Sequence, residues 1–150
     1  MKLKLAIALM LLPVPAMAQV APAADAPGHT AAGVQLTQPK GWSANASGAV
    51  STFVSPESDL RISVVDVGVA ADARAAAAKA WSLYRPAGAP SPRVVTAGPP
   101  ADGWEERVSL SYETSPNEKA TRSALALRQG QAWTVMIVDG AEATANKRSA

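Results

Sequence analysis

The sequence predicts an α+β fold, in which an antiparallel β-sheet of about six to seven strands packs with one or two helices. Apolar and polar residues alternate over 104–112, which is typical of a half-buried strand. The period changes to that of a helix over residues 73–84. The predicted strands come in runs on either side of that helix rather than alternating with helices, and this favours an antiparallel sheet.

The first 18 residues have the design of a secretory signal peptide. Lys2 and Lys4 form a short basic region, and residues 5–12 form an apolar run that is too short to span a bilayer. Ala16 and Ala18 then place small residues at the cleavage positions. We therefore expect a periplasmic or secreted protein, with an N-terminal membrane anchor or a buried helix as the alternatives. No cysteine follows the apolar run, which excludes a lipid-anchored lipoprotein.

The charges argue against nucleic acid or a membrane surface as partners. The chain has 14 Lys and Arg and 12 Asp and Glu, so removal of Lys2 and Lys4 with the signal leaves 12 of each. No basic run remains that would attract nucleic acid or anionic lipid. The chain has no cysteine and one histidine, so the sequence predicts no zinc site, and it contains no glycine motif for a nucleotide cofactor.

Residues 19–33 are rich in Ala and Pro and show no periodicity, which predicts a flexible or semi-extended linker. His29 lies in this segment and has no evident partner, so we interpret it as a solvated linker residue rather than a ligand or base. Residues 34–150 are then expected to form a single α+β domain, long enough to bury a hydrophobic core without disulfides.

The domain is predicted to begin with three strands. Alternation at Val34 and Leu36 indicates a short first strand. Residues 49–55 and 60–67 alternate in the same way and indicate the second and third strands. The four residues between these two strands are Pro, Glu, Ser and Asp, which are turn residues, so we expect the strands to pair as a hairpin.

Residues 73–84 predict a helix, because they are dominated by good helix formers and follow Asp72, a favourable N-cap. One face of this helix is apolar at helical spacing and comprises Ala77, Ala80, Trp81 and Tyr84. We expect the small residues to let the helix approach the sheet closely while the two aromatic side chains anchor it in the core. The alternative is that these aromatics line a ligand groove.

The C-terminal part is predicted to be a three-stranded meander, with strands at 104–112, 120–128 and 132–138. The last of these is apolar at almost every position and should lie near the centre of the sheet. A short strand at 93–97 is flanked by prolines and is expected at an edge. Residues 141–150 have helical character again, and we interpret this helix as apparently truncated because it shows no stop signal.

The sequence contains no recognisable catalytic constellation. No serine lies three residues before any lysine, so the Ser-x-x-Lys motif of penicillin-binding enzymes is absent. Ser43 lies in a segment that resembles a nucleophile elbow, but the segment lacks the last glycine and a base. Glu105 and Glu106 are adjacent on a predicted strand and should point to opposite faces. We therefore predict no catalytic, cofactor-binding or metal-binding residues. The four tryptophans are expected to share one core: Trp42, Trp81, Trp104 and Trp133.

Several local motifs together resemble a known family. They are the turn 39–42, the hairpin 55–62, Ala80-Trp81, Asp102-Gly103-Trp104, the turn 114–118 and Trp133-Thr134-Val135. From Val34 to the C-terminus, the chain resembles the N-terminal, non-catalytic region of exported bacterial serine hydrolases related to class C β-lactamases and penicillin-binding proteins. That region is similar in layout to PsbP-like α/β sandwiches, which implies an antiparallel sheet covered by helices.

The resemblance implies an accessory or binding role rather than catalysis. In the family the closing helix continues into a hydrolase domain that carries the Ser-x-x-Lys nucleophile, and no position of this chain matches a catalytic residue of that domain. The expected partner is a hydrolase domain or another envelope protein, and the chain is either a truncated member of the family or a free-standing accessory domain. The alternatives are a small periplasmic hydrolase and a structural envelope protein.

Overall fold

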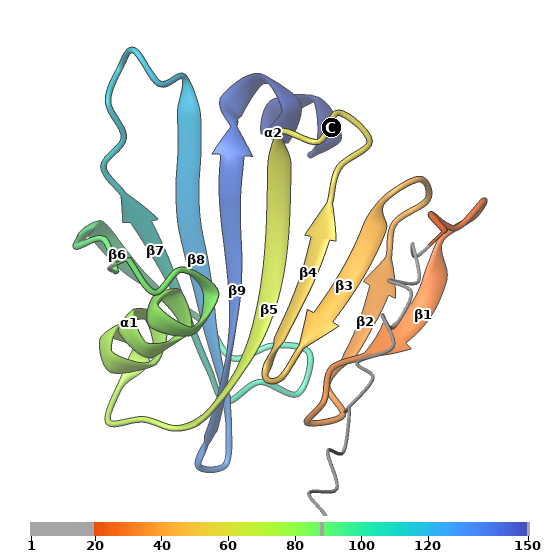
Figure 1. Cartoon of the computed structure of the whole chain (residues 1–150). Coiled ribbons are helices and arrows are strands. Elements are labelled where there is room, and N and C mark those ends of the chain that lie inside the picture. The colour runs from red at the N-terminus through yellow and green to blue at the C-terminus, as the bar shows by residue number, and fades with distance from the viewer. Residues whose placement is uncertain (1–19, 88, 150) are drawn as a thin grey trace, which may run out of the picture.

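The computed structural model describes residues 20–87 and 89–149, which form a seven-stranded antiparallel sheet, a separate two-stranded sheet and two helices (Figure 1). This confirms the predicted α+β sandwich. The predicted signal peptide, residues 1–18, lies outside the described residues. The strands are β1 (Ala26–His29), β2 (Gln35–Gln38), β3 (Ser43–Ser47), β4 (Val50–Val54), β5 (Leu60–Val69), β6 (Pro92–Gly98), β7 (Glu106–Tyr112), β8 (Ala120–Gln129) and β9 (Ala132–Ala141).

The large sheet has the strand order β3-β4-β5-β9-β8-β7-β6. β9 is therefore the central strand, as its apolar sequence predicts. β6 lies at an edge, as the prolines that flank it predict. The meander β7-β8-β9 pairs in sequence order, with Leu125 opposite Met136 on β9. The β4–β5 hairpin joins this meander through β5, which pairs with β9 from Leu60 opposite Gly140 onward. The β4–β5 hairpin and the β7-β8-β9 meander thus meet at the middle of the sheet.

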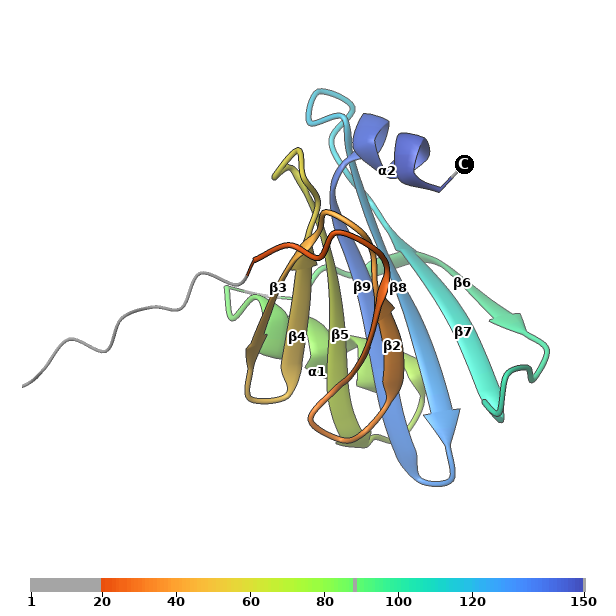
Figure 2. The ribbon, with the colours of Figure 1, turned by 90° about the vertical axis from the view of Figure 1, so that its right-hand side faces the viewer.

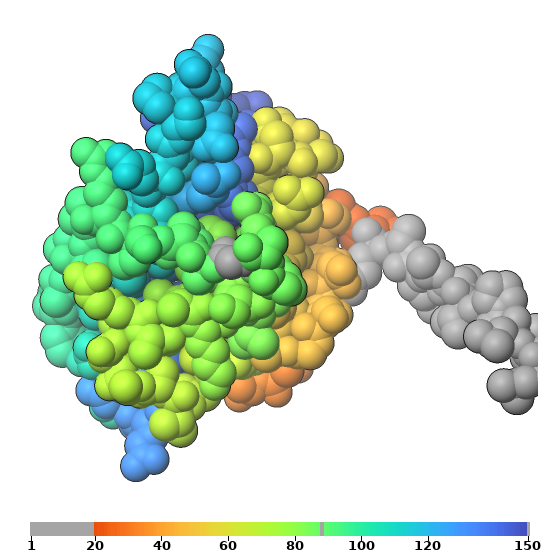
Figure 3. All heavy atoms as spheres, turned by 60° about the vertical axis from the view of Figure 1, so that its left-hand side comes forward, coloured from red at the N-terminus to blue at the C-terminus, as the bar shows by residue number. Residues whose placement is uncertain are grey.

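Helix α1 (Ala73–Tyr84) covers one face of the sheet, over β5, β9 and β8 (Figure 3, yellow-green to green). The Asp72 side chain accepts a hydrogen bond from the backbone N–H of Ala75 at 2.8 Å, which satisfies one of the free amides at the helix start. Pro86 follows the last turn and cannot continue the helix. The buried residues of α1 are Ala73, Ala76, Ala77, Ala80 and Trp81. The predicted Ala-rich packing face is therefore confirmed.

The hydrophobic side chains form two cores, one on each face of the sheet. Trp81 and Trp133 lie in the larger core beneath α1, with Val135 and Ile137 of β9. Trp42 lies in a second core on the opposite face, with Phe53 and Leu60 as its other buried members. The expectation that the tryptophans share one core was wrong. Successive side chains of a strand point to opposite faces of the sheet, and in this protein both faces are partly buried, so the tryptophans are divided between two cores.

The segment predicted to be a linker contains a strand. Ala26–His29 forms β1, which pairs antiparallel with β2 and lies against the sheet face opposite α1 (Figure 2). Asp66 of β5 holds this hairpin, since its carboxylate accepts hydrogen bonds from the Thr30 hydroxyl and the Ala32 amide, each at 2.8 Å. The β1 strand is stabilised by these long-range contacts rather than by local β-propensity. The Ala- and Pro-rich composition of the segment therefore did not indicate a strand.

Helix α2 (Glu142–Arg148) packs at the end of β8 and β9, on the face opposite α1 (Figure 2). Ala145 contacts the smaller core, and the Thr144 hydroxyl donates a hydrogen bond to Asp59 at 3.1 Å. Glu57, in the β4–β5 turn, accepts hydrogen bonds from Lys147 at 3.1 Å and Arg148 at 2.7 Å. The β4–β5 turn therefore binds the C-terminal end of α2 through these ion pairs.

We expect the docking of α2 to depend on pH through Glu57. The hydrogen bonds from Arg148, its own backbone and Lys147 lower the pKa of Glu57 from 4.5 to about 2. A lowered folded-state pKa means that the stabilisation is present above pH 4.5 and is lost as the pH falls towards 2. The protection factors of the amides in 142–148, which correct for the intrinsic pH dependence of exchange, should fall across this range in the native protein. In Glu57→Gln this fall should be absent, and an equal fall in both proteins would contradict the assignment.

Candidate functional site

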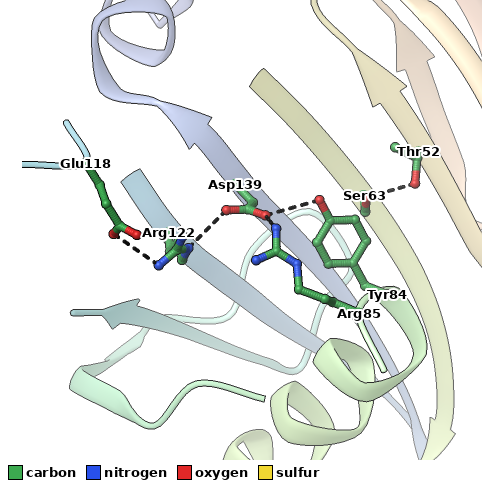
Figure 4. A network of polar contacts seen from close by, with 7 residues as sticks. All are labelled: Thr52, Ser63, Tyr84, Arg85, Glu118, Arg122 and Asp139. Atoms are coloured by element: carbon green, nitrogen blue, oxygen red, sulfur yellow. Dashed lines mark hydrogen bonds and ion pairs between the residues drawn. The ribbon is translucent and has the colours of Figure 1, made fainter. Parts of the chain in front are cut away.

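A buried carboxylate lies between the end of α1 and the sheet. Asp139 of β9 is 5% exposed and accepts hydrogen bonds from the Tyr84 hydroxyl at 3.2 Å and the Arg122 Nε at 3.2 Å (Figure 4). Arg85, directly after α1, also forms an ion pair with this carboxylate. Arg122 in turn contacts Glu118 at 3.5 Å. The network fixes the C-terminal end of α1 to the central strands.

The register of the sheet explains how these residues come together. Asp139 pairs directly with Arg61 on β5 and with Arg122 on β8, so the three side chains project from the same face. Asp139 continues the period-2 series of Val135 and Ile137, which carries it to the α1 face. Two arginines, Arg85 and Arg122, form ion pairs with this carboxylate, and Arg61 is its neighbour in the strand register, so the local charge is positive even after Glu118 is counted.

Tyr84 acts in this network as a hydrogen-bond donor. Burial raises its pKa above 10, and the negative charge of Asp139 raises it further. The phenol therefore keeps its proton and donates to the Asp139 carboxylate. Asp139 in turn has its oxygens occupied by Arg85, Arg122 and Tyr84, so neither group is placed to act as a general base.

A pocket of about 580 Å³ with polar and apolar walls opens beside the network, between the end of α1 and strands β3–β5. Its cationic lining residues are Arg61 and Arg85, and none of the described side chains that line it is acidic. Its other lining residues are Asn45, Ser47, Val50, Thr52, Val54, Leu83 and Tyr84. We call this feature the arginine pocket.

The opposite face of the sheet has an apolar strip that no described segment covers. The β1–β2 hairpin lies over the part of the face near β5 and β9, and α2 lies over the end of β9 and β8. The rest of β8, together with β7 and β6, remains open in Figure 2. A shallow depression of about 230 Å³ runs along these strands. We define the open strip as Val94, Thr96, Ser109, Ser111, Ser123, Leu125 and Met136.

The open strip continues into a second depression of about 610 Å³ between the sheet, the N-terminal segment and α2. Ser123 and Val138 line both depressions, so the two form one continuous surface. The floor of the second depression is apolar, with Trp42, Leu60 and Ile62. Lys40 and Arg148 stand among its polar lining residues, whereas the strip itself contains no charged side chain.

The residues singled out in the sequence do not form a site. Ser43 lies at the start of β3 in the large sheet, and His29 lies in β1 of the small sheet. Both are exposed, and neither side chain forms a hydrogen bond with any other residue in the part of the chain that the structure describes. Ser43 therefore has no hydrogen-bonded base among the described residues. Of the residues that contact Asp139, the sequence analysis named only Tyr84, as a core anchor or as a residue that lines a ligand groove.

Glu105 and Glu106 do not diverge as the sequence predicted. Both carboxylates bind the guanidinium of Arg128, at 2.9 Å and 3.0 Å respectively. The prediction was wrong because Glu105 precedes β7, which begins at Glu106, so strict strand alternation does not apply to the pair. The arginine between them holds both carboxylates in ion pairs on the surface.

Two further features bear on function. Among residues 20–87 and 89–149, no cluster of three or more His, Cys, Asp or Glu side chains is arranged to hold a metal ion. Neither of the two helices found in this part of the chain is long and apolar enough to cross a membrane.

A comparison of the chain with protein-family models and with curated proteins found no significant match.

Proposed function

We propose that the chain is an exported, non-catalytic binding domain that packs against another protein through the open strip. The observation that supports this most directly is an apolar surface at the centre of the sheet face, made by Leu125 and Met136, that no described segment covers. A sheet face that is apolar is normally buried against another element. A sheet face left open in this way marks an interaction surface.

The chemistry of the strip favours a helix of the partner as its occupant. On the other face, α1 packs through alanines that allow close approach, with Trp81 as the anchor. The open strip presents aliphatic side chains between short serine and threonine side chains, so it is apolar and nearly flat. A helix with an apolar stripe at i, i+3, i+4 and i+7 would bury these residues without leaving a charge unpaired.

The family resemblance indicates the class of partner. In the serine hydrolases that the chain resembles, the corresponding region is joined to a catalytic domain, so we propose a hydrolase domain of that class as the partner. Export to the periplasm or cell surface, which the first 18 residues predict, would place both proteins in the same compartment.

The non-catalytic part of the proposal is tested by active-site labelling. We expect the mature chain to remain unlabelled by a fluorophosphonate and by a fluorescent penicillin, because Ser43 has no base within the described residues. The measurement is in-gel fluorescence, with a purified serine hydrolase as the positive control. Stoichiometric labelling of the folded chain that disappears in Ser43→Ala would instead establish the small-hydrolase alternative.

A further inference from the structure

The arginine pocket has the composition of a ligand site, although it lies on the sheet face opposite the open strip. From its charge and its walls, we infer that it binds a small organic anion, with a carboxylate or phosphate group attached to a short apolar group. This inference is independent of the partner proposed above, because the two surfaces share no residue.

The first argument is the excess of positive charge. Arg85 is ion-paired with Asp139, but its side chain is 46% exposed and only one of its nitrogens donates to that carboxylate. A guanidinium has five N–H donors, so donors remain that can reach into the pocket. Arg61 is opposite Asp139 in the strand register, yet no carboxylate among the described residues lies within 4.0 Å of it. Two cationic groups thus border one pocket that has no acidic lining.

The second argument is the polarity of the opposite wall. Asn45 and Thr52 lie opposite each other on β3 and β4, and both line the pocket. Thr52 and Ser63 share a hydrogen bond of 2.9 Å in which either hydroxyl can donate (Figure 4), and when Ser63 donates, the Thr52 proton is free for a ligand. An amide and a hydroxyl can each donate to an anionic oxygen, and hydrogen bonds to charged groups are the stronger kind. Carboxylate and phosphate oxygens therefore match what these walls offer.

The third argument is the apolar part of the lining. Val50, Val54 and Leu83 contribute aliphatic surface beside the ring of Tyr84. The volume of about 580 Å³ lies within the usual range of small-molecule pockets. Chloride or inorganic phosphate would leave these side chains in contact with water, whereas an anion with a short alkyl or aryl group would cover them. The pocket therefore favours an amphiphilic anion.

A purely structural role for the arginines makes a different prediction about Arg61. Arg85 and Arg122 fasten Asp139 and α1, so their replacement would disturb the fold whether or not a ligand binds. Arg61 makes no such ion pair within the described chain and lines the pocket directly. Its replacement should therefore spare stability and weaken binding of the anion, and this separates the two roles.

The test is an NMR titration of the ¹⁵N-labelled mature chain with hexanoate and with hexyl phosphate. Both anions should shift the amides of Asn45, Thr52 and Leu83, while hexanol should not. We expect Arg61→Gln to weaken binding about tenfold, the loss of one charge-assisted hydrogen bond. Arg74→Gln, on the exposed side of α1, is the matched control and should bind as the native protein does.

A second arm distinguishes a soluble anion from a lipid headgroup. Sedimentation with phosphatidylglycerol vesicles that is lost in Arg61→Gln would assign the site to a lipid phosphate, whereas saturation by hexyl phosphate without sedimentation would assign it to a soluble ligand. Both outcomes support an anion site. Absence of amide shifts with either anion, equal binding of hexanol, or unchanged affinity in Arg61→Gln would overturn the inference.

Discussion

Replacement of Gly140 by alanine is expected to cost about 3 kcal/mol or more of folding free energy, because the new Cβ would collide with backbone atoms. It would lie 2.3 Å from the carbonyl oxygen of Asp59 and 2.6 Å from the Cα of Leu60. Neither atom belongs to a side chain that could move aside. Gly140 also has a φ of 153°, which residues with side chains rarely adopt. Urea unfolding followed by circular dichroism would measure the loss.

Gly48→Ala is the control for this prediction. Gly48 also has a positive φ, 56°, but no atom lies within 4 Å of the position where its Cβ would stand. Its replacement should therefore show the conformational penalty alone, about 1 kcal/mol. If Gly140→Ala cost no more than Gly48→Ala, the close approach of β9 to the β4–β5 turn would be refuted.

Truncation of Trp81 to alanine is expected to destabilise the domain by about 3–5 kcal/mol. Trp81 is 1% exposed, and its ring makes edge-on contacts with Tyr84 at 5.7 Å and Tyr112 at 5.2 Å between centroids. It is the largest of the fully buried side chains and belongs to the core between α1 and the sheet. The cavity left behind would be too large for the neighbouring alanines of α1 to fill. Chemical unfolding monitored by far-UV circular dichroism would report the change.

Leu83→Ala on the same helix separates packing from helix propensity. Leu83 is 45% exposed, so its truncation should cost less than about 1 kcal/mol. Because alanine is the best helix former, a similarly small loss in both variants would mean that α1 is held by its own helicity rather than by Trp81. A much larger loss in Trp81→Ala than in Leu83→Ala would show that packing of Trp81 in the core holds the helix on the sheet.

The elements with strong periodic signals could be predicted from the sequence. Helix α1 has the predicted bounds because Asp72 and Pro86 mark its ends and its apolar face has helical spacing. β9 could be placed at the sheet centre because its residues are apolar on both faces. β1 and β3 were not predicted, since their alanines, serines and glycine lack β-propensity. The order of β1 depends on tertiary contacts such as those of Asp66, and that of β3 on its pairing with β4.

The candidate sites were harder to predict than the fold. The network around Asp139 joins residues separated by 17 to 55 positions in sequence, and only the strand register brings them together. The one available signal was a carboxylate that continues the buried period of Val135 and Ile137. The open strip could not be foreseen at all, because alternation shows that two faces exist but does not show which face the rest of the chain leaves uncovered.

The most direct test of the central claim is site-specific photo-cross-linking from the open strip in the cells that produce the chain. Val94→p-benzoylphenylalanine places the probe on a strip residue that is 52% exposed, and Val69→p-benzoylphenylalanine is the control, 71% exposed and outside the strip. The account predicts one discrete cross-linked protein from position 94, identified by mass spectrometry as a serine hydrolase, and none from position 69. The product should disappear when Leu125→Lys is added. Equal cross-linking from both positions, none from position 94, or persistence with Leu125→Lys would contradict the account.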